Sequence, residues 1–285
     1  MLKIGFIDYY IDEWHANSYP KMISDSRFKD KFTIARAWEL TTLPGKTPLA
    51  AWCRKYGVQQ ANSLAEVVEE CDCLVVLSPD NPEYHEELAD LPLRSGKPIY
   101  IDKPFAPTLA TAERMIAKAR QHETPLMSSS ALRFGSELEA MLHGCLAGLP
   151  VHFVATRGGG NFLTYAIHQL EMLVMTLGTG ARRVMQCGLP ETPIMIIDYA
   201  DGRRGMINLI PGQPFQMSVF FGEQQTRVIN SMDDFFPHFI DSMLEFFITR
   251  QSVVDLNETL EITALVETGL LALKTPDVWV PVAGR

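Results

Sequence analysis

With 285 residues, of which 47% are apolar and 21% charged, the chain has a globular composition and the length of one large or two ordinary domains. That composition excludes a disordered or fibrous protein. The net charge of −9 repels a polyphosphate backbone, so a nucleic-acid partner is not expected, although a local site could still bind one anionic cofactor.

The first half of the chain alternates strand-like and helix-like segments. Short apolar runs typical of buried parallel strands occur at residues 3–7, 32–38, 74–77, 98–101 and 125–128. Between them, Ser63 and Glu66 form a capping-box pattern, and Asn81, followed by a proline, and Thr108 are predicted to begin helices. The alternation predicts a Rossmann-like, doubly wound parallel sheet over residues 1–128.

The pattern changes after about residue 130. Helices are predicted at 136–146 and near 165–177, and strands at 151–156, 193–199, 205–210, 216–221 and 226–229. We expect a second α/β domain over residues 129–285 with an open, mostly antiparallel sheet, whose two closing helices could pack back on the first domain. Because wide open sheets commonly pair across subunits, we also expect a homo-oligomer, either a dimer or a tetramer.

The cysteines and histidines do not form a metal-binding pattern. The five cysteines lack metal-ligand spacing, and His15, His85 and His168 show no HxxxH spacing, so no metal is expected. An odd number of cysteines favours free thiols in a reducing compartment. The first residues read as a strand rather than a signal peptide, and no apolar run approaches ~18 residues, so a cytoplasmic protein without a membrane partner is expected.

The turn after the first strand departs from the usual dinucleotide pattern. A dinucleotide site in a doubly wound sheet normally reads GxGxxG there, because glycine lets the backbone approach the diphosphate. Here Asp8, Tyr10 and Glu13 occupy the three glycine positions. Carboxylates beside a diphosphate repel it, so the sequence favours a weakened or lost nucleotide site over a redesigned one.

Aromatic residues dominate the same turn. Asp8, Tyr9 and Tyr10 are the residues that would face a cofactor there. Trp14 and His15, with Tyr10, could stack on a sugar substrate, or they could plug the vacated cleft, which is the interpretation we prefer. His15 is therefore a candidate substrate-binding residue.

Several later motifs, in order, carry a family resemblance. They read SPDNPEYHEELADLPLRSGKPIYIDKPFAPT from Ser78, SSSALRF at 128–134, GGGNFLTYAIHQLEMLVMTLG at 158–178 and FPHFIDSMLEFFITRQ at 236–251. With these motifs the chain resembles the glucose–fructose oxidoreductase, inositol dehydrogenase and MocA-like family over most of its length beyond residue 60. The resemblance implies a Rossmann domain, a second domain with an open sheet, and NAD or NADP as cofactor. It also implies hydride exchange at a carbinol carbon of a sugar, polyol or derivative.

The resemblance assigns roles to residues on the cofactor side. Lys103 in Asp102-Lys103-Pro104 matches the family's catalytic lysine in its Glu-Lys-Pro motif, and Asp102 is either a site residue or a salt-bridge partner. Ser78, Pro79, Asp80 and Asn81 lie where the family's loop passes the nicotinamide ribose. Glu39 follows the second strand, where an acidic residue would hold the adenosine ribose hydroxyls.

The resemblance also assigns residues on the substrate side. His168 matches the histidine that ends the family's Asp-x-x-x-His segment, but Thr164 replaces its aspartate. Glu171 stands one helical turn later, where an acid is frequent, and serves the site or a salt bridge. Arg133 would contact substrate or pair with an acid.

The chemistry is consistent with these residue types. A carbinol carbon releases hydride only as its hydroxyl proton departs, which requires a base of near-neutral pKa, and a histidine side chain begins at about 6.5. A lysine ammonium stabilises the developing alkoxide. Lys103 and His168 are therefore the predicted catalytic residues, although a turn lysine and a hydrogen-bonded core histidine would look the same.

Two functions from different classes remain open. The first is a divergent NAD(P)-dependent oxidoreductase acting on a sugar-like substrate, favoured by Lys103, His168 and the loop at Ser78. The second is a non-catalytic or regulatory small-molecule-binding protein on the same scaffold, favoured by the filled glycine positions and by Thr164.

Overall fold

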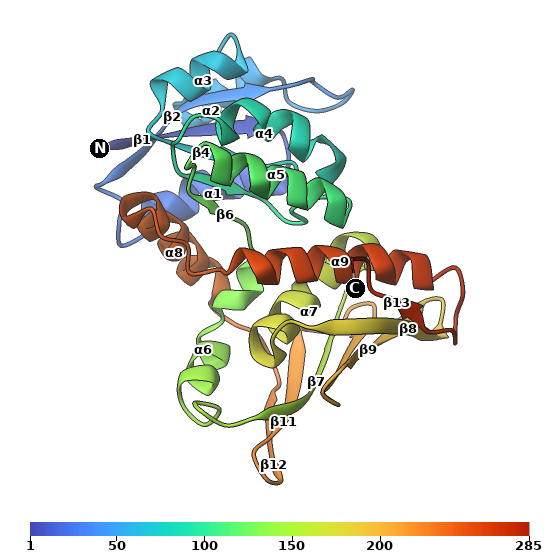
Figure 1. The fold of residues 1–285 in the computed structure, drawn as a ribbon. Coiled ribbons are helices and arrows are strands. Elements are labelled where there is room, and N and C mark those ends of the chain that lie inside the picture. Colours follow the sequence, from blue (N-terminus) through green and yellow to red (C-terminus); the bar gives the residue numbers. More distant parts are fainter. Residues whose placement is uncertain (285) are drawn as a thin grey trace. The chain divides into compact units, whose positions relative to one another are not determined.

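The computed structural model describes residues 1–284, which divide into two compact units. The first unit comprises Met1–Ser129 and Ile240–Asp255, and the second comprises Ser130–Phe239 and the chain from Leu256 onward. Figure 1 follows the chain through each unit. No helix within residues 1–284 is long and apolar enough to cross a membrane.

The first unit contains a six-stranded, wholly parallel sheet in the order β3-β2-β1-β4-β5-β6. Its elements are β1 (Leu2–Asp8), α1 (Trp14–Asp25), β2 (Phe32–Glu39), α2 (Leu49–Tyr56), β3 (Gln59–Gln60), α3 (Leu64–Glu70), β4 (Cys73–Val76), the short helix η1 (Pro82–Tyr84), α4 (His85–Leu93), β5 (Ile99–Ile101), α5 (Leu109–Gln121) and β6 (Leu126–Met127). The predicted doubly wound sheet is confirmed. Because β1 and β4 are central, their apolar side chains are fully buried, which contributes roughly 1.5–3 kcal/mol for each large side chain.

Side-chain caps explain where several helices begin. The Ser63 hydroxyl accepts the amide of Glu66 at 3.2 Å and the Glu66 carboxylate accepts the amide of Asn62 at 2.8 Å, as the capping-box pattern predicts. At α5 the hydroxyl of Thr108 caps the helix by accepting the amide of Thr111. A helical segment begins after Asn81 as predicted, with Asn81 at the N-cap position of η1 and Pro82 next, but the Asn81 side chain donates to Glu83 and makes no capping hydrogen bond.

The segment 240–255 belongs to the first unit. It contains most of α8 (Phe235–Thr249), whose Asp241 accepts a hydrogen bond from the Ser26 hydroxyl at 2.5 Å. Glu245 pairs with Arg27 at 2.7 Å. These contacts join α8 to the end of α1 and the turn after it.

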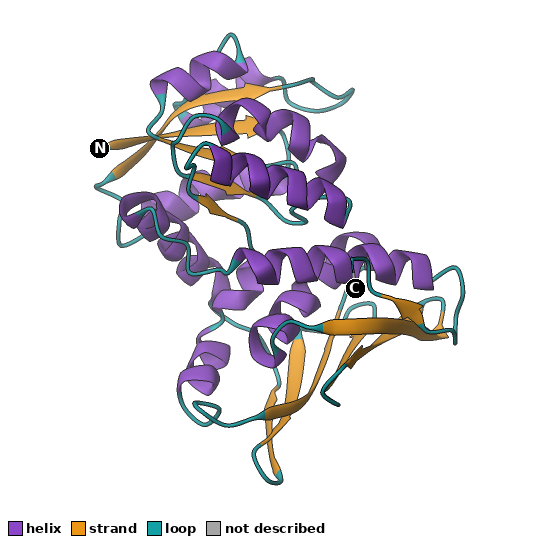
Figure 2. Cartoon of the chain, in the orientation of Figure 1, coloured by secondary structure: helices purple, strands orange, loops and turns teal. Residues whose placement is uncertain are grey.

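The second unit contains a seven-stranded mixed sheet in the order β12-β11-β7-β10-β9-β8-β13. Its elements are the short helix η2 (Ala131–Phe134), α6 (Ser136–His143), β7 (Val151–Gly158), α7 (Phe162–Leu177), β8 (Ala181–Leu189), β9 (Thr192–Tyr199), β10 (Arg204–Leu209), β11 (Gln216–Phe221), β12 (Gln225–Ile229), α9 (Leu256–Ala272) and β13 (Val280–Pro281). The predicted, mostly antiparallel sheet is confirmed, with a parallel pair of β7 and β10 as the exception. Figure 2 distinguishes these strands from the helices of the unit.

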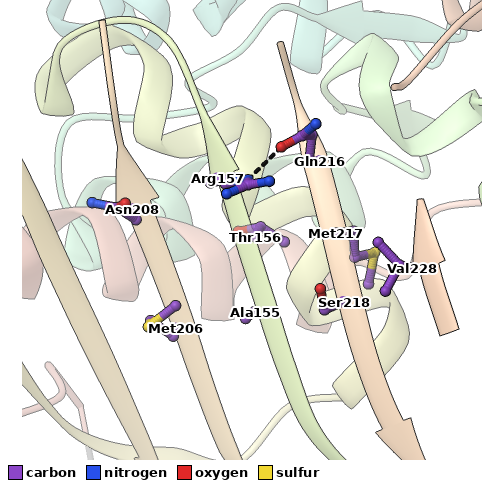
Figure 3. Close-up of a pocket in the computed structure, with 9 residues that line it drawn as sticks. All are labelled: Ala155, Thr156, Arg157, Met206, Asn208, Gln216, Met217, Ser218 and Val228. Carbon is purple, nitrogen blue, oxygen red and sulfur yellow. Dashed lines mark hydrogen bonds between the residues drawn. The ribbon is translucent and has the colours of Figure 1, made fainter. Parts of the chain in front are cut away.

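The helices α7 and α9 pack against one face of this sheet. Gly269 allows the close approach of α9, because a Cβ there would lie 2.4 Å from the Phe162 ring and 2.8 Å from the sulfur of Met195. The other face carries side chains such as Met206, Ser218 and Val228, which line a cavity of about 280 Å³ (Figure 3).

Candidate active site

The carboxyl ends of three central strands carry most of the residues predicted for the cofactor side. Asp8 ends β1, Ser78 lies two residues after β4, and Asp102 and Lys103 follow β5. Parallel strands bring these positions to one edge of the sheet, beside the change in strand order between β1 and β4. Asp8, Asp102, Lys103 and Ser78 are all buried.

The carboxyl group of Glu13 occupies the N-terminus of α1. It accepts the amide of His15 at 2.6 Å and the amide of Ala16, and it is 5% exposed. The first amides of a helix have no partner within the helix, and in a dinucleotide site they meet the diphosphate. In this chain the third residue of the altered glycine pattern satisfies them instead.

The aromatic residues do not form the expected plug. Trp14 is 53% exposed, so it does not fill a cleft. Tyr9 stacks on Tyr84 with ring centroids 4.0 Å apart, and the ammonium of Lys46 lies 5.0 Å from the centre of the half-buried Tyr10 ring. The carboxyl of Glu13, rather than an aromatic ring, covers the helix end.

Glu39 is also bound within the chain. Its carboxylate accepts the amide of Ile11 at 2.9 Å, the amide of Leu49 at 3.2 Å and the hydroxyl of Thr42. Both oxygens therefore hold the loop after β1 and the start of α2, where the resemblance places the adenosine ribose.

Asp8 and Glu13 lie in an environment that disfavours ionised carboxylates. Burial, followed by the charge of Glu13, raises the pKa of Asp8 well above its usual value, and neither Asp8 oxygen has a hydrogen-bond partner of normal geometry among the described residues. Burial also raises the pKa of Glu13 to about 7, although His15 and the two capped amides act in the opposite direction.

Asp102 differs because it is paired. It accepts from Nδ1 of His15, from the amide of Lys103 at 2.8 Å and from the hydroxyl of Tyr100 at 3.2 Å. Burial alone would raise the pKa of Asp102, but His15, Lys103 and these hydrogen bonds outweigh burial and lower it. Asp102 is thus an ionised, fully buried carboxylate between a histidine and the predicted catalytic lysine.

The loop after β4 is fixed by a buried histidine. Nε2 of His85 lies 2.7 Å from the carbonyl oxygen of Leu77 and 3.1 Å from that of Ser78, and its Nδ1 lies 3.0 Å from that of Phe105. His85 therefore connects the loops after β4 and β5. In this loop Pro79 is buried, Asn81 is half-buried and Asp80 is exposed.

The predicted substrate-side residues belong to a network in the second unit. Nδ1 of His168 lies 2.7 Å from the hydroxyl oxygen of Ser130, whose amide donates to Glu171 at 3.1 Å. Arg133 pairs with Glu171 at 2.8 Å and with Glu258 at 2.6 Å, and Arg133 and Glu171 are buried. The structure thus gives Arg133 and Glu171 the salt-bridge role that the sequence left open.

Thr164 lies in the first turn of α7. Its hydroxyl and its amide both donate to the side chain of Asn161, at 3.1 Å each. The glycine turn before this helix is sterically required, because Gly160 has a φ of +95° and a Cβ there would lie 2.0 Å from the Tyr165 ring. Thr164 therefore stabilises the helix start.

Sequence reasoning missed the roles of Glu13 and Ser130. An acid directly before a helical segment is a standard capping signal, so Glu13 could have been found by asking where α1 begins. No local signal identifies Ser130, because its partners His168 and Glu171 are 38 and 41 residues away. Within residues 1–284, no group of three or more His, Cys, Asp or Glu side chains could hold a metal ion.

Comparison with known proteins supports the resemblance. Residues 27–130 match the sequence model of the oxidoreductase family with an NAD-binding Rossmann fold. Over 103 residues, or 36% of the chain and 32% of the relative, the sequence is 31% identical to YceM of Salmonella typhimurium, which is named as an oxidoreductase. The matched segments span 32–46% of the curated relatives' lengths.

Solved structures extend the likeness to the whole chain. The WlbA dehydrogenase of Bordetella pertussis, in complex with NADH and UDP-GlcNAcA, aligns with a TM-score of 0.79 at 15% identity, covering 100% of this chain and 99% of the other. The scyllo-inositol dehydrogenase of Lactobacillus casei, with NAD(H) and scyllo-inositol, aligns with a TM-score of 0.77 at 13% identity and covers 100% of both chains. At these identities the structures establish the fold.

The family model thus supports, over residues 27–130, the resemblance stated from the motifs, and the solved structures show that the whole chain has the fold of these dehydrogenases. At the N-terminus of α1, however, the carboxyl group of Glu13 competes with a dinucleotide's diphosphate for the helix amides. The amides of His15 and Ala16 are bound by Glu13, and the unpartnered carboxyl of Asp8 lies in the same turn.

The buried state of Glu13 predicts a pH-dependent stability. The pKa of Glu13 is about 7 in the folded protein and 4.5 ordinarily, so the folded state favours the protonated carboxyl. The contribution of Glu13 to the free energy of unfolding is therefore fully present below about pH 4.5 and is lost as the pH rises through 7. Glu13→Gln keeps a capping oxygen but does not ionise. Between about pH 5 and pH 8, the free energy of unfolding of the wild type should fall relative to this variant by an amount on the order of a few kcal/mol.

Urea unfolding of both proteins across this pH range checks the prediction. Burial lowers the pKa of His85, whose contribution has the opposite slope, but both proteins contain His85, so the difference between them reports Glu13 together with its effect on the neighbouring Asp8. Parallel stability curves would show that Glu13 is not a buried titrating carboxyl.

Proposed function

We propose that the chain is an NAD(P)-dependent oxidoreductase that exchanges hydride between a nicotinamide cofactor and a CH–OH carbon of a sugar, polyol or derivative. The observation that carries the proposal is Lys103, which is 7% exposed beside the ionised Asp102 after β5, within the segment that matches an oxidoreductase family model. Solved relatives with the same fold were crystallised with NADH and UDP-GlcNAcA and with NAD(H) and scyllo-inositol, which supports this substrate class.

The roles follow from charge and proton balance. The ammonium of Lys103 stabilises negative charge on the substrate oxygen, and Asp102 orients the lysine through its backbone amide and balances its charge. A base must accept the hydroxyl proton, and the resemblance assigns this step to His168. Because Nδ1 of His168 is bonded to Ser130, that nitrogen is not available to the substrate.

A second function has its own supporting observation. The capping of α1 by Glu13 removes the amides that normally bind a diphosphate, which favours a small-molecule-binding protein without a dinucleotide. The two functions differ in one measurable property, the binding of NADH or NADPH.

Calorimetric titration with NADH and NADPH tests the proposed activity, which requires saturable binding of at least one of them at or below millimolar concentration. Turnover is then measured with scyllo-inositol and UDP-GlcNAcA as probes. Lys103→Ala should reduce turnover by about a hundredfold or more and leave cofactor affinity largely intact, because it removes charge stabilisation at the reacting oxygen. Lys274→Ala, which removes an exposed lysine, is the control.

If neither NADH nor NADPH binds, the oxidoreductase function is excluded, and the function as a small-molecule-binding protein without a dinucleotide remains. Full activity in Lys103→Ala would instead exclude the assigned role of this lysine.

We also propose that the chain forms a homo-oligomer through the open face of the second sheet. Among the described residues, the helices with extensive contacts to this sheet are α7 and α9, which lie on the other face. Figure 3 shows the lining of the open face, in which Met206 and Val228 are apolar and Arg157 is hydrogen-bonded to Gln216. The five free thiols support the further proposal of a reducing, cytoplasmic location.

Val228→Asp tests the oligomer. Val228 is on β12, opposite Ser218 of β11, and is 51% exposed, so the substitution should not disturb the core. In the oligomer it would place an unpaired carboxylate in the interface. We expect the dissociation constant of the oligomer to rise at least about tenfold, measured by analytical ultracentrifugation. Val253→Asp, at a 68% exposed valine of the first unit, should change nothing. A monomeric wild type at micromolar concentration would contradict the proposal.

A further inference from the structure

We propose that His15, oriented by Asp102, is the residue that exchanges a proton with the substrate hydroxyl in this chain. The inference rests on the proposed oxidoreductase function for its reaction. It gives His15 the step that the resemblance assigns to His168, and it depends only on residues of the first unit.

The first argument is the arrangement of the imidazole ring. Nδ1 of His15 bonds the carboxylate of Asp102, while Nε2 makes no hydrogen bond within residues 1–284. A carboxylate at one ring nitrogen selects the tautomer with the proton on that nitrogen and leaves the lone pair of the other nitrogen to accept a proton. The His15 side chain is 12% exposed, so the ring is held firmly and remains accessible.

The second argument is that the ring is fixed from three sides. It stacks on Tyr19 with centroids 5.2 Å apart and an interplanar angle of 11°, and its backbone amide is held by Glu13. The Trp14 ring lies 5.2 Å away, edge-on. Because Trp14 is 53% exposed, its indole offers an apolar surface next to the imidazole ring, of the kind that ligand sites use.

The third argument is the position of the carboxylate partner. Asp102 also accepts the amide of Lys103, so a single buried carboxylate positions the histidine and the lysine. The charged and titratable groups around the pair are Glu13 and Asp8 on the β1–α1 segment, Lys103 after β5, and the hydroxyls of Tyr19 and Tyr100. By contrast, His85 has both ring nitrogens facing backbone carbonyls, and Nδ1 of His168 meets the hydroxyl of Ser130 rather than a carboxylate.

The proton step balances without any further reactant. The O–H bond of the substrate hydroxyl breaks, its proton forms a bond with Nε2 of His15, and the electron pair remains on the oxygen as an alkoxide. The imidazolium that results is stabilised by the Asp102 carboxylate, and the alkoxide by the Lys103 ammonium. In the reverse direction His15 returns the proton.

Nuclear magnetic resonance of ¹⁵N-labelled histidine tests the orientation without requiring turnover. Among the seven histidines, His15 should populate the tautomer with the proton on Nδ1, and Asp102→Asn should abolish that preference. Diethyl pyrocarbonate should acylate His15 at Nε2. A wild-type His15 with its proton on Nε2, or one resistant to the reagent, would overturn the inference.

Kinetics then test the catalytic role with His15→Gln, Asp102→Asn, His168→Gln and, as the control, His143→Gln at an exposed position. With scyllo-inositol or UDP-GlcNAcA as substrate, His15→Gln should lower kcat by about a hundredfold or more, with KM and NADH affinity nearly unchanged. Asp102→Asn should lower kcat together with the tautomer change, and His168→Gln should lower kcat less than His15→Gln does.

The outcomes separate the two proposals. If His15→Gln keeps full turnover while His168→Gln loses it, the role of His15 is wrong and the oxidoreductase stands. If the wild type binds neither NADH nor NADPH, the proposed oxidoreductase function is wrong. The catalytic role of His15 is then wrong as well, even if His15 carries its proton on Nδ1.

Discussion

The hydrogen bonds from the first amides of α1 to the carboxyl of Glu13 are the contacts on which the candidate site depends. They satisfy the free amides at the end of this helix, and they fix His15 at the first turn with its ring toward Asp102. The same backbone turn carries Asp8 and Tyr9, and Glu39 holds it through the amide of Ile11. A carboxyl group of the protein itself therefore stands where a doubly wound sheet usually receives an anion from a ligand.

Three buried carboxyl groups at this edge of the sheet have different states because their partners differ. Asp8 has no partner of normal geometry among the described residues, and burial raises its pKa well above the usual value. Glu13 accepts two amides, which partly offsets burial and leaves its pKa at about 7. Asp102 has His15 and Lys103 beside it, and its pKa is lowered. Only Asp102 is thereby suited to orient a base and to balance a lysine at neutral pH.

The sequence predicts the frame of this site better than its contacts. Buried strands such as residues 74–77 are recognisable because central parallel strands are apolar on both faces, and Lys103 is predictable because it directly follows such a strand. The strand β8 was missed, since Arg182, Arg183 and Gln186 interrupt its apolar pattern. The pairing of His15 with Asp102 joins residues 87 positions apart, and no local pattern contains that information.

The most direct measurement of the central claim is the NADH affinity of Glu13→Gly, determined by calorimetry at about pH 8 beside Glu123→Gly. Both variants remove one carboxyl group from the first unit, and Glu123 is exposed with a φ of +51°, where glycine is well tolerated. If Glu13 occupies the anion position of α1, Glu13→Gly frees the amides of His15 and Ala16 and should bind NADH at least about tenfold more tightly than the wild type and Glu123→Gly. Equal affinity in all three proteins would contradict the account.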